Sequence, residues 1–161
     1  MPMNKPYVAG EALQGRTGHE AGRELLARMY RETCGENCPE IAIEERGKPY
    51  FVTGGWHFSI SHTKKHVFCA LSTQPVGLDA EEMDRKIDLR LAEKILSESE
   101  KIRYEAEPDK REALLKLWVL KEAAAKLTGE GLRGYPRDTD FSPNDPRVTQ
   151  MDGCYVAVLE E

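Results

Sequence analysis

The chain has 161 residues, 40% of them hydrophobic and 32% charged, which is enough to bury a core in one domain and unlike a disordered segment. The net charge of −5, from 28 acidic and 23 basic residues, and the lack of a long Lys/Arg run argue against nucleic-acid binding. No apolar stretch reaches the length of a membrane span and residues 1–10 lack the apolar centre of a signal peptide, so we expect a cytoplasmic protein without membrane partners.

The first third of the chain predicts one helix between less regular segments. Residues 1–16 contain several Gly and Pro residues and predict a loose lead-in. Thr17 and Glu20 have the spacing of a capping box, and they open an amphipathic helix that we expect to end near Gly35. A short strand is predicted over residues 41–43.

The middle of the chain predicts strands. Residues 58–62 alternate between apolar and polar side chains, as a half-buried strand does. Residues 67–71 form a continuous apolar run, and residues 76–81 predict the next strand after a turn that contains Pro75. We therefore expect a hairpin over residues 66–81.

The last part predicts helices and then a strand. Ser97 begins a second capping box, and Asp109 precedes the longest element, a helix over about 110–128. Asp152-Gly153 predicts a hairpin turn before a strand over residues 155–159. This order of elements favours an α+β fold over a regular βαβ alternation.

The cysteines and most histidines give no clear functional pattern. Cys34 and Cys38 could supply half of a metal site, but no second Cys or His pair follows at zinc spacing. We interpret them as free thiols of a reducing compartment, and Cys69 and Cys154 as core residues. The remaining histidines are interpreted as ordinary residues: His19, His57 and His66.

Two acidic residues suggest a cation site. Asp79 and Glu81 lie two apart in a predicted strand, so their side chains point to one face. Neighbouring carboxylates repel one another unless a cation lies between them, and hard oxygen ligands suit Mg²⁺. A solvated acidic pair has the same pattern, and spacing alone favours that interpretation.

The predicted long helix carries a second candidate pair. Glu122 and Lys126 are four residues apart and lie on one side of the helix. They could meet the two strand carboxylates as a third acid and a phosphate-neutralising lysine. Glu–Lys pairs at this spacing are also common on exposed helix surfaces, and spacing alone favours that reading.

Two turns or strand ends carry basic residues. His62 follows Ser61 at the end of a predicted strand, where a protonated imidazole can bind phosphate, although most isolated histidines only form hydrogen bonds. Lys48 lies between Gly47 and Pro49 and could present its charge to a ligand, or belong to an ordinary turn.

The order of these segments is more informative than any one of them. Residues 77–81 match G-x-D-x-E and residues 118–126 match W-x-x-K-E-x-x-x-K, preceded by G-K-P at 47–49 and S-x-S-H at 59–62. In this order they resemble the 4′-phosphopantetheinyl transferase superfamily. The resemblance covers residues 47–127, and residues 21–26 are similar, less specifically, to a helix of its N-terminal lobe.

The resemblance implies an α+β fold of the 4′-phosphopantetheinyl transferase type. Its two small related lobes would be built of antiparallel strands packed with helices, within one domain over residues 1–161. An abbreviated N-terminal lobe would cover about 1–72 and the C-terminal lobe about 73–161. The motifs are closer to the longer, two-lobed surfactin-synthetase-activating branch than to the short trimeric branch, so we expect a monomer, with a dimer as the alternative.

The resemblance also implies a reaction. The 4′-phosphopantetheine moiety of coenzyme A would be transferred, with Mg²⁺, to a serine of an acyl or peptidyl carrier protein, releasing adenosine 3′,5′-bisphosphate. Asp79, Glu81 and Glu122 would hold the metal, Lys126 would contact the transferred phosphate, and Glu122 would accept the serine proton. The residues implied at the coenzyme A site are Arg23, Lys48, Ser61, His62, Lys121 and Lys126.

Two other functions remain open from the sequence. One is a non-catalytic coenzyme A or carrier-protein binding module of the same fold, because the basic residues that clamp the 3′-phosphate from the first lobe have no firm match. The other is a helix-rich interaction module whose charged residues are solvated. The three-carboxylate pattern argues against a mere binder, because such like charges are costly to bring together.

Overall fold

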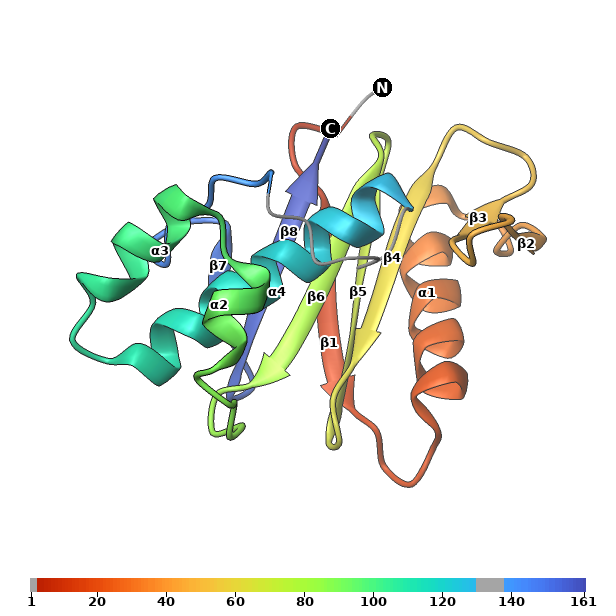
Figure 1. Cartoon of the computed structure of the whole chain (residues 1–161). Helices are drawn as coiled ribbons and strands as arrows, with labels where there is room; N and C mark the ends of the chain where they lie inside the picture. Colours follow the sequence, from red (N-terminus) through yellow and green to blue (C-terminus); the bar gives the residue numbers. More distant parts are fainter. Residues whose placement is uncertain (1–2, 130–137) are drawn as a thin grey trace.

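The computed structural model describes residues 3–129 and 138–161, with strands and helices mixed along the chain (Figure 1). The first half contains β1 (Tyr7–Ala12), α1 (Gly18–Cys34), β2 (Ile41–Ile43), β3 (Pro49–Phe51), β4 (His57–His62) and β5 (His66–Ser72). The second half contains β6 (Val76–Glu82), α2 (Leu91–Ile95), α3 (Glu98–Glu105), α4 (Lys110–Thr128), β7 (Val148–Met151) and β8 (Cys154–Glu160). The predicted α+β fold class is confirmed.

Two antiparallel sheets of three strands carry the two halves. The first has the order β1-β5-β4 and the second β6-β8-β7, while β2 and β3 form a separate hairpin. The hairpin predicted over residues 66–81 is wrong, because β5 already has β4 and β1 on its two edges and β6 pairs with β8. Residues 73–75 instead carry the chain from one sheet to the other. The loose lead-in predicted over residues 1–16 is also wrong, since it contains β1.

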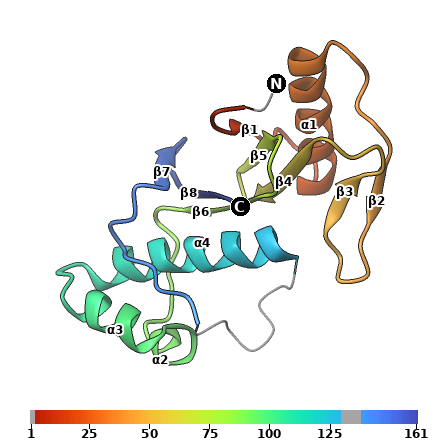
Figure 2. The same ribbon diagram turned by 90° about the horizontal axis from the view of Figure 1, so that it is seen from above.

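The two largest helices each cover one sheet. Helix α1 packs on β4 and β5, and α4 packs on β6 and β8, as Figure 2 shows from above. A third core cluster joins the two sheets and is drawn from β5, β6 and β8: Phe68, Ala70, Val76, Leu78, Ala80, Cys154 and Val156. In the described part of the chain, no helix is both long and apolar enough to cross a membrane.

Short-range signals explain most helix ends. Ser97 and Glu100 form a full capping box at α3, and Asp109 accepts a hydrogen bond from a backbone N–H in the first turn of α4. Gly129 ends α4 with φ at 76°, a left-handed conformation that glycine adopts without strain. The predicted bounds of the long helix are therefore confirmed.

The predicted turn between the last two strands is also confirmed. Asp152 and Gly153 have φ values of 50° and 76°, as the tight turn of a two-residue hairpin requires, and they join β7 to β8.

Candidate functional site

Two serines of β4, the edge strand of the first sheet, form hydrogen bonds to β6 of the second sheet. Strands β4 and β6 lie against each other, but they are not neighbours in either sheet. The Ser59 hydroxyl accepts a hydrogen bond from the Leu78 N–H at 2.9 Å, and the Ser61 hydroxyl accepts one from the Ala80 N–H at 3.3 Å. The two side chains thereby satisfy backbone groups that no paired strand reaches, and they hold β6 beside β4.

Gly77 lets α4 lie directly on β6. A Cβ atom at this position would lie 2.1 Å from the Ala123 carbonyl oxygen and 2.6 Å from the Leu127 nitrogen. Only glycine therefore permits this approach of helix to strand. The approach brings Lys126 within 3.2 Å of Asp79, measured from Nζ to Oδ1.

Asp79 is a buried carboxylate, and only one of its two oxygens forms hydrogen bonds to described residues. Its side chain accepts hydrogen bonds at Oδ1 from the Ser61 hydroxyl at 3.1 Å and from Lys126. Among the described residues, the buried Oδ2 has no hydrogen-bond partner. Burial raises the pKa of Asp79, and Lys126 and Ser61 offset this effect only in part. An unpaired buried oxygen is costly unless a cation or water meets it.

Glu81 and Glu122 line the same cavity as Asp79, which has a volume of about 380 Å³. Burial, together with the negative charges of Asp79 and Glu81, raises the pKa of Glu122 to about 7, although Lys126 and Arg85 act in the opposite direction. Burial also raises the pKa of Glu81, against the influence of Arg85. A divalent cation among these carboxylates would relieve their repulsion, so the donor set fits Mg²⁺.

The three carboxylates do not form a closed set of ligands as they stand. Glu81 forms an ion pair with Arg85. Among the described residues, no single choice of oxygens places Asp79, Glu81 and Glu122 all within 4.8 Å of one another. Cation binding would therefore require these three side chains to move closer together, and Glu81 to leave Arg85.

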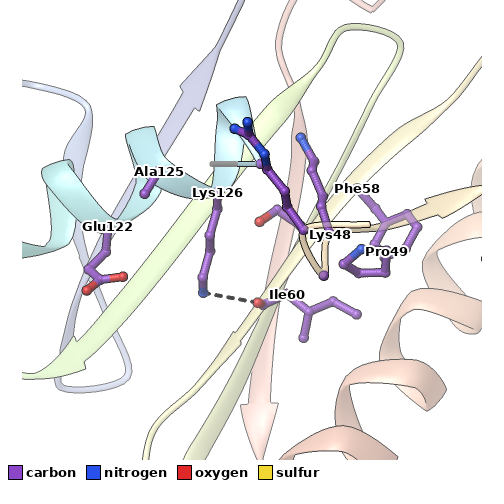
Figure 3. Close-up of a pocket in the computed structure, with 11 residues that line it drawn as sticks. Lys48, Pro49, Phe58, Ile60, Glu122, Ala125 and Lys126 are labelled. Atoms are coloured by element: carbon purple, nitrogen blue, oxygen red, sulfur yellow. Dashed lines mark hydrogen bonds between the residues drawn. The ribbon is translucent and has the colours of Figure 1, made fainter. Parts of the chain in front are cut away.

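A second cavity of about 330 Å³ adjoins the first. The two share three lining residues, Ile60, Glu122 and Lys126, and the second also contains Lys48 (Figure 3). Lys126 extends from α4 toward β4 and donates to the Ile60 carbonyl oxygen at 3.3 Å. Lys48 donates to the Leu127 carbonyl oxygen at 2.8 Å, and burial lowers its pKa. Acidic and basic groups thus line adjoining parts of one cleft.

Most of the predicted site residues lie in this cleft. The first cavity contains six of them, namely Asp79, Glu81, Glu122, Lys126, Ser61 and His62, and the second contains Lys48. The His62 ring packs against Gly18, where a Cβ atom would come within 2.2 Å of it.

Lys121 and Arg23 are not brought to the cleft. Lys121 is only 1% exposed, and its Nζ lies 2.7 Å from Glu100 Oε1 and 2.5 Å from Thr139 Oγ1. Its side chain therefore points into the core on another side of α4. Arg23 lines neither cavity, and its charge acts on the Cys38 thiol instead.

Several residues that line the cleft were not among the predicted site residues, and they include Arg46, Arg85 and Trp118. Trp118 lies one helical turn before Glu122, so the shared helix face could have indicated it. Arg46 directly precedes the Gly-Lys-Pro turn. Arg85 follows β6 in an irregular segment, where no periodicity predicts the direction of a side chain.

Comparisons with known proteins agree with the motifs. A family model described as the 4′-phosphopantetheinyl transferase superfamily matches residues 75–153. The 4′-phosphopantetheinyl transferase gsp of Aneurinibacillus migulanus is 39% identical over 115 residues, covering 68% of this chain and 47% of the relative. For psf-1 of Bacillus pumilus, the identity is 34% over 127 residues, 78% of this chain and 50% of the relative.

A further relative is the 4′-phosphopantetheinyl transferase Sfp of Bacillus subtilis (strain 168). It is 29% identical over 129 residues, which are 78% of this chain and 56% of the relative. The chain thus spans about half the length of the curated relatives it matches.

Proposed function

The chain belongs to the 4′-phosphopantetheinyl transferase superfamily, and on this premise we propose that it transfers the 4′-phosphopantetheine moiety of coenzyme A to a carrier-protein serine. The reaction depends on Mg²⁺ and releases adenosine 3′,5′-bisphosphate. One observation carries the proposal: Asp79, Glu81 and Glu122 line a cavity that adjoins another lined by Lys48 and Lys126.

The acidic end of the cleft is the proposed metal site. Asp79, Glu81 and Glu122 would hold Mg²⁺, and the unpaired Oδ2 of Asp79 supports this assignment. When bound, the ion would neutralise the pyrophosphate of coenzyme A and polarise the phosphorus that is attacked. Ser61 already donates to Asp79, so we assign it to positioning that carboxylate rather than to contacting the substrate.

The basic end of the cleft is the proposed coenzyme A site. Lys126 lies close to Asp79 and would stabilise the negative charge that develops on the transferred phosphate. Lys48 and His62 would bind the nucleotide end. Lys121 is left out, because its ammonium group is buried against Glu100. Arg23 is left out as well, because it lines neither cavity.

Glu122 is the proposed proton acceptor. The carrier serine oxygen forms a bond to phosphorus, the bond from that phosphorus to the departing nucleotide phosphate breaks, and the serine proton passes to Glu122 directly or through water. Burial and the neighbouring acids raise the pKa of Glu122 to about 7 in the metal-free protein, and a bound cation would keep the carboxylate ionised and able to accept a proton. The attacking oxygen belongs to the partner, so the chain needs no nucleophile of its own.

Several features of the whole protein belong to the same proposal. The partner is an acyl or peptidyl carrier protein, and the two sheets correspond to an N-terminal lobe over about 1–72 and a C-terminal lobe over about 73–161. We propose a monomer that acts in the cytoplasm, with a dimer as the alternative. The four free cysteines support a reducing compartment.

A carrier-loading assay tests the function. With Mg²⁺ and coenzyme A, the chain is expected to add roughly 340 Da to apo carrier proteins, the mass of the transferred arm, as read by intact mass spectrometry. Glu122→Gln and Lys126→Ala should each slow the transfer about 100-fold or more, because each removes charge from the reacting centre. Glu112→Gln, in the first turn of α4 and outside both cavities, is the matched control.

The outcomes separate the alternatives. Coenzyme A binding without transfer to any of several acyl and peptidyl carriers would favour the non-catalytic module. If neither transfer nor a thermal shift with Mg²⁺ and coenzyme A is seen, the proposal fails. A ligand at about 100 times its Kd should stabilise the chain by roughly 2.7 kcal/mol, a shift that is readily measured.

A further inference from the structure

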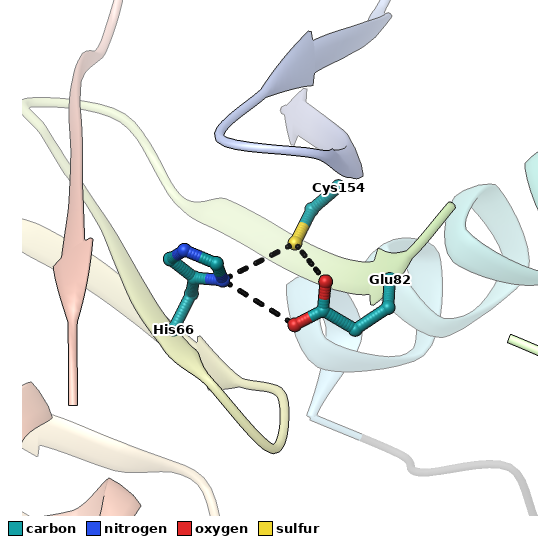
Figure 4. A group of neighbouring side chains, drawn as sticks. All are labelled: His66, Glu82 and Cys154. Atoms are coloured by element: carbon teal, nitrogen blue, oxygen red, sulfur yellow. Dashed lines mark hydrogen bonds and ion pairs between the residues drawn. The ribbon is translucent and has the colours of Figure 1, made fainter. Parts of the chain in front are cut away.

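A second group of metal-ligating side chains lies outside the cleft. It consists of His66 at the start of β5, Glu82 at the end of β6 and Cys154 at the start of β8, which point toward one another in Figure 4. Consecutive side chains of a strand point to opposite faces, so Glu82 belongs to the other face of β6 from the cleft carboxylate Glu81. The group is therefore distinct from the proposed Mg²⁺ site.

The separations between its atoms are close to those of a tetrahedral site, with the sulfur and the nitrogen each next to a different oxygen of Glu82. The Cys154 Sγ lies 3.9 Å from His66 Nδ1 and 3.4 Å from Glu82 Oε2, and His66 Nδ1 lies 3.3 Å from Glu82 Oε1. Zinc bonds of about 2.0–2.3 Å to nitrogen, oxygen and sulfur predict separations of roughly 3.4–3.6 Å between ligand atoms. Small side-chain movements would bring all three groups to one ion.

Neighbouring hydrogen bonds hold these ligands in place, and two of the three ligands are partly exposed. The Thr63 hydroxyl donates to Glu82 Oε1 at 2.7 Å and accepts from the His66 backbone N–H at 3.0 Å. Such supporting hydrogen bonds orient metal ligands. Cys154 is buried, whereas the side chains of His66 and Glu82 are 20% and 17% exposed. A neighbouring cavity of about 590 Å³ reaches Thr63 and Glu82 of this group, and Glu81 lines it as well.

We propose that His66, Glu82 and Cys154 bind a transition-metal ion of the Zn²⁺ type, with water in the fourth position. Thiolate and imidazole are ligands for such ions and not for Mg²⁺, so the two sites select different metals. His66 belongs to the first sheet, and Glu82 and Cys154 belong to the second. A bound ion therefore clamps the two halves of the molecule together.

Zinc titration of the chelator-treated full chain tests this site. Excess Mg²⁺ is present to occupy the cleft, and a chromophoric zinc chelator competes for the metal. One Zn²⁺ per chain is expected, and Cys154→Ala and His66→Gln should each weaken binding at least about tenfold. Cys38→Ala and His57→Gln are the matched controls and should bind as the unchanged chain does. Glu122→Gln should also retain zinc, even if transfer is lost.

Cobalt gives a direct readout of the thiolate. The Co²⁺-loaded chain should show a sulfur-to-metal charge-transfer band that Cys154→Ala abolishes and Cys38→Ala retains. Zinc should also raise the Tm of the unchanged chain and not that of His66→Gln. Since His66 is partly exposed, that variant remains informative if Cys154→Ala does not fold. Equal zinc affinity in the unchanged chain and both ligand variants, or no cobalt–sulfur band, would overturn the proposal.

Discussion

Glu122 illustrates how one residue links the chemistry of the cleft to stability. Its carboxylate is half-buried near two other acids, and the nearby charges of Lys126 and Arg85 compensate only in part. Folding therefore raises its pKa from 4.5 to about 7. The folded chain binds this proton more tightly than the unfolded chain does, which gives the protein a measurable dependence on pH.

For the metal-free chain, we expect the Glu122 contribution to stability to be lost as pH rises. Below about pH 4.5, Glu122 is protonated in both the folded and the unfolded chain and does not oppose folding. Above about pH 7 it is ionised in both, and the cost of its charge in the folded chain opposes folding fully. The free energy of unfolding therefore falls across that window. Glu122→Gln should make the fall shallower, and saturating Mg²⁺ should do the same by stabilising the ionised form. Urea unfolding at several pH values measures this. Equal slopes in both chains would contradict it.

Lys121 carries a charge that is paired in the core and does not line the cleft. It is 1% exposed and paired with Glu100, which is fully buried. Lys121→Met should destabilise the chain by roughly 3–5 kcal/mol, because it leaves an uncompensated carboxylate in the core. The Kd for coenzyme A should stay unchanged in the folded fraction, as measured by calorimetry.

A second lysine of the same helix provides the comparison. Lys116→Met breaks the more exposed ion pair with Glu112 and should cost less than about 1 kcal/mol. If Lys121→Met instead left stability intact and abolished coenzyme A binding, Lys121 would return to the proposed site.

At the scale of elements, the site depends on how α4 crosses β6. The strand supplies Asp79 and Glu81, the helix supplies Glu122 and Lys126, and Gly77 sets the distance between them. The serines of β4 fix the other side of the strand. Three elements from both halves of the chain thus determine the positions of the carboxylates.

Gly77→Ala should separate α4 from β6. The added Cβ would overlap the Ala123 carbonyl, so the helix must shift, at a cost of roughly 1–3 kcal/mol. We expect weaker Mg²⁺ binding and slower transfer in the folded variant, measured by calorimetry and the loading assay. Gly153→Ala is the control, since its positive φ strains the backbone but open space surrounds it. Equal effects of both variants on Mg²⁺ binding would argue against a specific role for the α4–β6 contact.

At the scale of the whole molecule, an apolar layer between the sheets joins the two halves. Phe68 of β5, Leu78 of β6 and Val156 of β8 are fully buried in it. Residues from both sheets therefore depend on the same packing. This supports the prediction that residues 1–161 form one domain rather than two that fold separately.

Leu78→Ala tests that prediction. The variant should lose about 2–5 kcal/mol, because a cavity opens between the sheets. Both the unchanged chain and the variant should unfold in a single transition, with circular dichroism and tryptophan fluorescence coinciding. Trp56 and Trp118 lie in different halves and report on each. Two separate transitions, only one of them shifted, would show that the halves fold independently.

Local signals in the sequence determined the helix ends, the last hairpin and the family resemblance. Ser97, Asp109 and Gly129 contact groups only a few residues away along the chain, so their effect can be predicted without knowledge of the fold. The order of the motifs that contain Asp79, Glu81, Glu122 and Lys126 identified the candidate site through the family resemblance, whereas their spacing alone also fitted solvated charges.

The tertiary structure alone decided which faces meet. Lys121 and Glu122 are adjacent and so point about 100° apart around α4, and only packing reveals that the glutamate lines the cleft while the lysine enters the core. Strand β5 is the central strand of the first sheet because β1 pairs with the edge that β4 leaves open. His66, Glu82 and Cys154 are far apart in the sequence and meet only where two sheets join. Such contacts depend on long-range packing, which residue spacing does not encode.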